Sequence, residues 1–267
     1  MELVRITAEN IDREHICCAI SEKKGENCVS AKKAWLKERL KEGLEFIKLD
    51  VRGKVFIEYI PAEYAWCPVE APGYLFINCF WVAGQFKGQG YGNQLLDYCI
   101  ADAKKKGRKG LVALSSRKKM PYLSDPGFFR HRGFQTADTA EPHYELLYLP
   151  FEEDNRQAPE SLPSQADGNK SIPYLKECAK YGVTEEKGWV LYYTHQCPHT
   201  AKYVPVLTGY AKNRGITIRT VRFENAEEAR NSPNPFTTYA LFYDGKFVTN
   251  EIQSENSFEK RLTKMGL

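Results

Sequence analysis

The stretch QFKGQGYG at residues 85–92 decides the fold class, because it separates two different sequence patterns. The preceding residues 74–82, YLFINCFWV, form a nearly unbroken apolar run, which is typical of a central strand covered on both faces. The following residues carry apolar side chains at helical spacing up to Gly107, which indicates a helix. Alternating glycines allow a sharp turn and close approach to a ligand, and the free amides of a first helical turn bind phosphate oxygens. The stretch therefore predicts either an anion-binding loop or only a tight turn.

The glycine spacing excludes two common nucleotide-binding motifs. Gly88, Gly90 and Gly92 follow the pattern G-x-G-x-G, whereas the dinucleotide fingerprint is G-x-G-x-x-G. A P-loop requires a lysine followed by serine or threonine after its last glycine, and that pair is missing here. An anion at this loop would therefore be held by backbone amides, with Lys87 adding a positive charge.

The sequence around this loop predicts a mixed α/β domain. Short alternating or apolar runs indicate strands, and apolar residues at helical spacing indicate helices. We expect strands at 3–6, 44–51, 54–60, 110–116 and 144–150, with the last closing the sheet, and helices at 13–20, 31–41 and 126–132.

The composition excludes several classes of protein. The chain has 267 residues, of which 42% are hydrophobic and 27% charged, so it is not mostly disordered. Its net charge of +4 does not indicate a nucleic-acid binder. No apolar run approaches the ~18 residues of a membrane span, and the N-terminus has no apolar signal core, so we expect a cytoplasmic protein. The 8 cysteines do not resemble the disulfide framework of a small secreted domain.

A break in composition divides the chain. Residues 151–170 are polar and acidic, contain two prolines and keep neither a strand nor a helix period, which is typical of a linker. We therefore expect one domain at residues 1–150 and a smaller one at 171–267.

Residues 3–150 resemble the GNAT superfamily of acetyl-CoA-dependent N-acetyltransferases. The resemblance rests on the strand at 76–82, the loop at 87–92 and the segment FFRHRGF at 128–134. In the family loop pattern, Lys87 takes the Arg/Gln position, and Gly90 and Gly92 are the two small residues. The resemblance implies a mixed sheet with flanking helices that binds acyl-CoA.

The resemblance also implies the reaction and the binding residues. Acetyl-CoA would be the cosubstrate, and an amine would attack its thioester directly. The acceptor would be a small-molecule or peptide amine bound by variable segments at residues 14–43 and 61–73, and a homodimer stays open. The residues implied for acetyl-CoA lie at the end of the apolar strand and in the glycine loop: Phe80, Trp81, Val82, Lys87, Gly88, Gln89, Gly90, Tyr91, Gly92 and Asn93.

The general acid departs from the family pattern. Phe129 stands where the family often has a tyrosine that protonates the leaving thiolate, and a phenyl ring donates no proton. Tyr122 stands seven residues earlier, where an asparagine is common. Either Tyr122 supplies the acid, or the thiolate leaves without one, or the domain is a non-catalytic acyl-CoA sensor.

Glu58 is the candidate general base. Strand alternation places it on the same face as Phe56 and Ile60, and a carboxylate among apolar side chains binds a proton more readily. The alternative, which we favour, is a carboxylate in solvent at the rim of the sheet.

The second domain resembles the thioredoxin fold in the order of its elements from Gly188 onward. The sequence CPHT at 197–200 stands where that fold carries two cysteines, with Thr200 in place of the second. A GNAT domain followed by such a tail resembles the acetyltransferases that carry a YoaP-like C-terminal domain. The position at a helix start and the neighbouring His199 would make Cys197 a better nucleophile, while a structural thiol is equally compatible.

Cys197 supports an alternative function, which is a monothiol redox or thiol-carrier protein. The spacing His195-x-Cys197-x-His199 would suit a metal, but a fourth ligand does not stand out. We therefore expect no metal.

Overall fold

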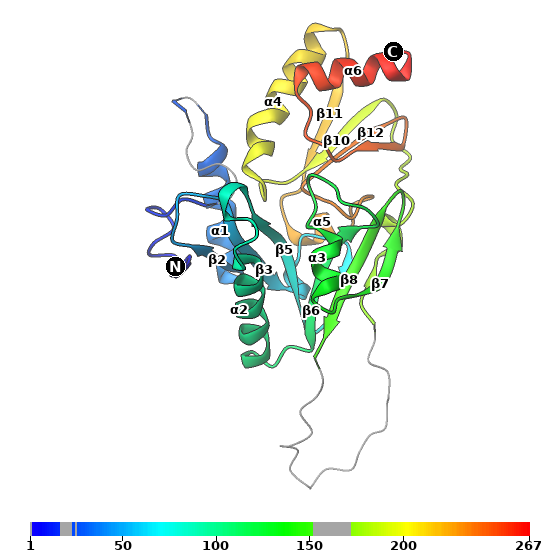
Figure 1. The fold of residues 1–267 in the computed structure, drawn as a ribbon. Helices are drawn as coiled ribbons and strands as arrows, with labels where there is room; N and C mark the ends of the chain where they lie inside the picture. Colours follow the sequence, from blue (N-terminus) through cyan, green and yellow to red (C-terminus); the bar gives the residue numbers. More distant parts are fainter. Residues whose placement is uncertain (1, 17–22, 25, 152–171) are drawn as a thin grey trace.

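The computed structural model describes residues 2–16, 23–24, 26–151 and 172–267, and Figure 1 shows their arrangement. We refer to residues 2–151 as the first part and to 172–267 as the second part. The first part contains β1 (Leu3–Arg5), α1 (Cys28–Lys41), β2 (Glu45–Leu49), β3 (Val55–Pro61), β4 (Val69–Glu70), β5 (Tyr74–Val82), α2 (Tyr91–Lys105), β6 (Gly110–Ser116), α3 (Pro126–His131), β7 (Gln135–Ala140) and β8 (Tyr144–Pro150). The second part contains β9 (Tyr174–Leu175), β10 (Trp189–Tyr193), α4 (Pro198–Asn213), β11 (Ile218–Arg222), α5 (Ala226–Arg230), β12 (Tyr239–Tyr243), β13 (Lys246–Thr249) and α6 (Glu255–Met265).

Seven strands of the first part form one mixed sheet in the order β1-β2-β3-β5-β6-β8-β7. The apolar strand β5 takes the central position, as its sequence predicts. It runs parallel to β6, and α2 makes the crossover that a parallel pair needs, whereas the other neighbours are antiparallel. The mixed α/β class is confirmed.

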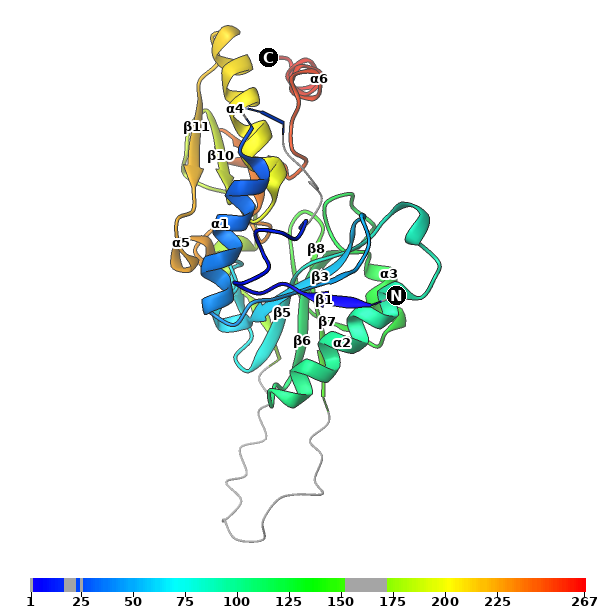
Figure 2. The same cartoon turned by 90° about the vertical axis from the view of Figure 1, so that its left-hand side faces the viewer.

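The two faces of this sheet bury different helices. Trp35 and Leu36 of α1 pack with one buried cluster, while Leu95 and Leu96 of α2 and Phe129 of α3 pack with another. Figure 2 shows α1 and α2 on opposite sides of the sheet. Both faces of β5 are therefore covered, which explains why its sequence does not alternate.

The second part forms a four-stranded sheet in the order β11-β10-β12-β13. β10 is parallel to β11 across α4 and antiparallel to β12. The β12–β13 hairpin turns at Asp244 and Gly245, both left-handed with φ of 45° and 75°, as a two-residue turn requires. α4 and α6 pack on one face of this sheet. The thioredoxin-like relation stays a prediction.

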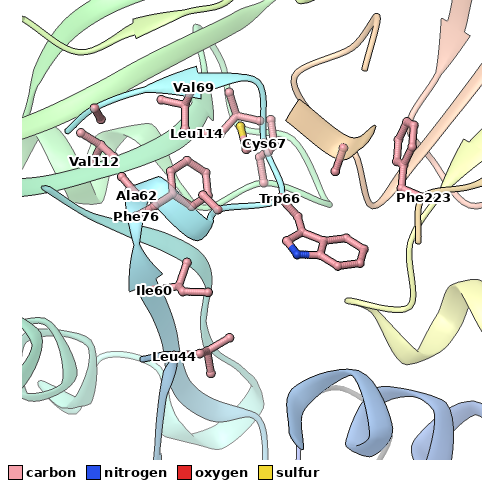
Figure 3. Close-up of a cluster of buried hydrophobic side chains, with 14 of the residues drawn as sticks. Leu44, Ile60, Ala62, Trp66, Cys67, Val69, Phe76, Val112, Leu114 and Phe223 are labelled. Carbon is pink, nitrogen blue, oxygen red and sulfur yellow. The ribbon is translucent and has the colours of Figure 1, made fainter. Parts of the chain in front are cut away.

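The two parts share buried structure. β4 pairs with β9, and α1 packs beside α4 (Figure 2). Arg230 of α5 forms a 2.8 Å ion pair with Glu70 of β4. The shared cluster, part of which is drawn in Figure 3, holds apolar side chains of both parts, among them Trp66, Phe76, Leu114, Tyr192, Phe223 and Phe242.

Some sequence predictions differ from the structure. The helix expected at 13–20 is absent from the described residues 13–16, and residues 17–20 lie outside the described ranges. The strand β7 was not expected, because its sequence QTADTA is polar and has no alternation with large apolar residues. β7 and not β8 is therefore the edge of the sheet. The expected linker also lies outside the described residues, except Phe151, and the division into two domains stays a prediction.

Candidate functional site

A bulge at Asn78 opens the sheet beside the glycine loop. Glu58 of β3 pairs with Cys79, and Tyr59 pairs with Ile77, so Asn78 is an extra residue in β5. The pairing between β5 and β6 ends at Ile77, although β5 continues to Val82. Because a bulge bends its strand, the last residues of β5 leave β6 while they stay paired with β3. Their backbone edge on the β6 side therefore has no strand beside it among the described residues.

The larger cavity lies at this free edge. Its volume of about 600 Å³ falls in the usual range of ligand sites. Its walls come from the end of β5, the glycine loop, the start of α2 and the segment before α3: Phe80, Trp81, Val82, Phe86, Lys87, Gly88, Gly90, Tyr91, Gly92, Asn93, Lys119, Met120, Pro121, Leu123, Ser124, Asp125 and Phe128. Nine of the ten residues expected at acetyl-CoA are among them; Gln89 instead donates a side-chain hydrogen bond to the carbonyl of Gln85.

Glycine suits each of the three loop positions for a different structural reason. Gly88 and Gly90 adopt left-handed φ values of 75° and 81°, which favour glycine, and a Cβ at either would meet nothing within 4 Å. Gly92 is helical, but a Cβ there would lie 3.3 Å from the Phe128 ring. Gly90 caps α2, so the free amides of the first turn of α2 border the larger cavity.

A smaller cavity of about 50 Å³ adjoins the larger one, sharing the wall residues Phe80, Trp81, Leu123 and Ser124 with it. It lies at the bulge and is closed by both parts of the chain. Its further walls are Trp66, Cys67, Phe76, Ile77, Asn78, Cys79, Leu114 and Tyr122 from the first part and Gln196, Pro235, Phe236, Thr237 and Thr238 from the second. The expected acceptor segment 61–73 contributes Trp66 and Cys67, whereas the contribution of the second part was not foreseen.

Glu58 is fully buried, so the interpretation of it as a solvent carboxylate at the rim was wrong. Its carboxylate lies 2.6 Å from Lys32 Nζ, and the exposed fractions of these side chains are 0% and 1%. Asn78 Nδ2 donates to the other oxygen at 3.1 Å. Glu58 lines neither cavity. The buried Lys32–Glu58 pair thus fixes the side chain of the bulged residue Asn78 through a hydrogen bond. This contact explains why a polar residue interrupts the apolar strand.

Tyr122 lines the smaller cavity. Its hydroxyl lies 3.0 Å from Nε2 of His143, and its ring centroid lies 5.4 Å from that of Phe236. Burial raises the pKa of Tyr122, while burial and the neighbouring Lys118 and Arg117 lower the pKa of His143. At neutral pH the phenol therefore keeps its proton beside a neutral imidazole.

Comparisons with known proteins identify the family of this chain. The description "Acetyltransferase (GNAT) family" matches residues 15–134, and "YoaP-like" matches residues 218–260. A Bacillus subtilis (strain 168) protein named "Uncharacterized N-acetyltransferase YoaP" is 42% identical over 263 residues, which is 98% of this chain and 99% of that protein. The chain belongs to the GNAT acetyltransferase family. Residues 218–260 of its second part are YoaP-like, and the sensor and thiol-protein alternatives are not favoured.

Solved structures of other GNAT acetyltransferases are also among the matches. The Escherichia coli ribosomal-protein-S18-alanine N-acetyltransferase is 15% identical with a TM-score of 0.40, covering 60% of this chain and 97% of its own. A Brucella melitensis GNAT acetyltransferase in complex with acetyl-CoA is 19% identical with a TM-score of 0.35, covering 59% and 92%.

Phe129 of this GNAT acetyltransferase is a core residue. It is fully buried, and its ring lies 4.7 Å from Phe134 and 6.1 Å from Phe80, centroid to centroid. Phe129 lines neither cavity. A tyrosine here would place a hydroxyl among apolar rings, so the phenylalanine suits its packing.

Cys197 caps the N-terminus of α4 and is half-buried. It lines neither cavity, although the preceding Gln196 lines the smaller one. The Thr200 hydroxyl lies 2.6 Å from the carbonyl oxygen of Thr194 and 2.7 Å from that of Cys197, so it stabilises the start of the helix. Burial lowers the pKa of both His195 and His199. Within the described ranges, no three His, Cys, Asp or Glu side chains gather as a metal site.

The substitution Cys197→Ser is expected to leave acetyl transfer nearly unchanged. The thiol does not touch either cavity, and a serine side chain also caps helices well. We expect kcat/KM for acetyl transfer to stay within about twofold of the unaltered protein, as for substitutions away from a site. Steady-state assays of CoA release measure this, and loss of activity would instead support a thiol-based function.

Proposed function

We propose that this chain transfers the acetyl group of acetyl-CoA to an amine at the junction of its two cavities. The observation that carries the proposal is the larger cavity, which is lined by nine of the ten residues expected to bind acetyl-CoA. The smaller cavity, which shares four wall residues with it, would receive the acceptor amine.

The larger cavity fits each section of acetyl-CoA. The pyrophosphate would lie at the amides of Gly90 to Asn93 with Lys87 nearby, because a helix N-terminus attracts anions. The pantetheine would extend along the free edge of β5, where the peptide groups of residues 80–82 can pair with its amides as another strand would. The thioester would then reach the shared wall at Phe80 and Trp81.

The proposed reaction is direct attack by a neutral amine. The nitrogen lone pair forms a bond to the thioester carbon, the C–S bond breaks with its electron pair on sulfur, and the amine proton passes to the thiolate or to water. A backbone amide on the free edge of β5 would stabilise the developing oxyanion. Glu58, enclosed by Lys32 and Asn78, has no base role in this proposal and instead positions the bulge.

The substitution Tyr122→Phe tests the predicted general acid. A thiol has an ordinary pKa of about 8.5, below that of a phenol, and burial raises the pKa of Tyr122 further. Proton donation from Tyr122 to the thiolate is therefore unfavourable, and we expect kcat to fall less than about tenfold, against the ~10²–10⁴-fold cost of losing a general acid. Presteady-state measurement of CoA release checks this, and a loss beyond 100-fold would assign the acid role to Tyr122.

The experiment that tests the proposed function measures both acetyl-CoA binding and acetyl transfer. Isothermal titration of the full chain with acetyl-CoA comes first, followed by a panel of primary amines and peptides assayed by thiol release and mass spectrometry of the products. We expect micromolar binding and acetylation of at least one amine. Absence of acetyl-CoA binding would overturn the proposal. Binding of acetyl-CoA without acetylation of any amine in the panel would instead support the non-catalytic acyl-CoA sensor.

We also propose a cytoplasmic location. Among the described cysteines, Cys67, Cys99 and Cys178 are free thiols, which suits a reducing compartment. No helix in the described ranges is both long and apolar enough to cross a membrane. The homodimer stays a prediction.

A further inference from the structure

The segment Pro235–Thr238 of the second part forms one wall of the smaller cavity and is hydrogen-bonded to the first part. The Thr237 hydroxyl donates to the carbonyl of Trp66, and the Cys67 thiol donates to the carbonyl of Pro235 at 3.4 Å. Burial raises the pKa of Cys67, so its thiol keeps the donated proton. The walls from the two parts are therefore held together by direct hydrogen bonds.

A buried asparagine sets the position of Phe236 within this segment. Asn234 Oδ1 accepts from the Phe236 amide at 3.0 Å and from Asn250 Nδ2 at 3.1 Å. It also lies 3.1 Å from the Tyr144 hydroxyl of β8, which has a shorter contact with Asn250 Oδ1. The Phe236 ring then lies against Tyr122 across the cavity wall. Contacts with both parts of the chain thus fix the position of Phe236.

The smaller cavity is short and carries no charge. Its wall residues in the described chain include no Asp, Glu, Lys, Arg or His. The Glu58 carboxylate accepts a hydrogen bond from the wall residue Asn78 and is paired with Lys32. A volume of about 50 Å³ has room for about three to five water molecules, which is the size of a small organic group. An ammonium or carboxylate that entered this cavity would find no opposite charge among these wall residues to offset the hydration it gives up.

We propose that Phe236 of the YoaP-like part determines acceptor specificity by closing the acceptor subsite. The acceptor is then a compact primary amine that has no charged or bulky group beside its nitrogen and enters in its neutral form. This inference rests on the proposed function, since it requires acetyl-CoA in the larger cavity.

The test uses CoA thioethers that carry an acceptor group. In CoA–S–CH2–CO–NH–R, the amide nitrogen stands in place of the acceptor amine, and R is ethyl, cyclohexyl or 2-ammonioethyl. Titration calorimetry of the full chain is expected to give affinities for the cyclohexyl and ammonioethyl conjugates at least about tenfold weaker than for the ethyl conjugate. Phe236→Ala is expected to strengthen cyclohexyl binding at least about tenfold, and Phe236→Leu by less, with affinity for CoA itself within about twofold.

The control variant is Tyr181→Ala, which removes an exposed aromatic ring of the second part that lines neither cavity. It should leave all three conjugate affinities unchanged. The inference is overturned if the cyclohexyl and ethyl conjugates bind the unaltered protein equally, or if both Phe236 variants leave their ratio unchanged. Failure of CoA itself to bind the unaltered protein would instead count against the proposed function.

Discussion

Gly90→Asp is expected to abolish acetyl-CoA binding while leaving the fold intact. Gly90 caps α2 with a left-handed φ of 81°, which aspartate tolerates better than most residues, and its Cβ meets no other atom within 4 Å. The new carboxylate would accept hydrogen bonds from the free amides at the start of α2 and would repel the pyrophosphate. Two unit charges 4–5 Å apart near a protein surface repel by about 3–4 kcal/mol. That repulsion weakens binding about 100-fold to 1000-fold, measured by titration calorimetry.

The matched control is Gly215→Asp. Gly215 follows α4, has a left-handed φ of 73°, and offers the same open space to a Cβ, but it borders neither cavity. It carries the same strain and charge and should leave affinity unchanged. Gly90→Asn keeps the shape of aspartate without the charge and should lie between the two. If Gly90→Asp binds acetyl-CoA within threefold of the unaltered protein, the phosphates do not lie at α2.

Lys32→Met is expected to be the most destabilising of the substitutions considered. Among the described residues, it leaves the Glu58 carboxylate, which has no exposed surface, with the hydrogen bond from Asn78 alone. Breaking a buried ion pair by removing one partner costs about 3–5 kcal/mol. At roughly 2–4 °C per kcal/mol, the melting temperature should fall by about 6–20 °C, measured by calorimetry or circular dichroism.

Two further variants distinguish the effect of breaking the buried ion pair from the effect of removing any lysine charge. Lys37→Met breaks the exposed pair with Asp12, 2.9 Å apart, and should cost less than about 1 kcal/mol. The double substitution Lys32→Met with Glu58→Leu removes both charges and should regain most of the stability, since apolar replacement of a buried pair is often neutral. A melting temperature for Lys32→Met equal to that of Lys37→Met would contradict the buried pair.

The elements that were predictable from the sequence have strong local patterns. β5 matches its predicted bounds because a strand covered on both faces is apolar throughout, and the glycine loop follows from backbone requirements at Gly88 and Gly90. β7 has no such pattern, because an edge strand with polar residues on both faces is indistinguishable from a loop.

The contacts that complete the site are long-range and leave no local signal. Lys32 lies beside Lys33 in the sequence, with no local signal that one of the two is buried, and its partner Glu58 is 26 residues away. The hydrogen bond from Thr237 to Trp66 spans 171 residues. The position of Asn78 within an apolar strand was the one sequence clue to the bulge, and only the register with β3 gives it a meaning.

The buried side chains shared by the two parts bear on how such an enzyme can change over evolutionary time. Loss of everything after residue 151 would uncover Trp66 and its apolar neighbours, and exposed patches of this kind promote aggregation. It would also remove the ring that faces Tyr122. Because the proposed acceptor subsite has walls from both parts, a change in the preferred amine would require compatible substitutions in both parts of the chain.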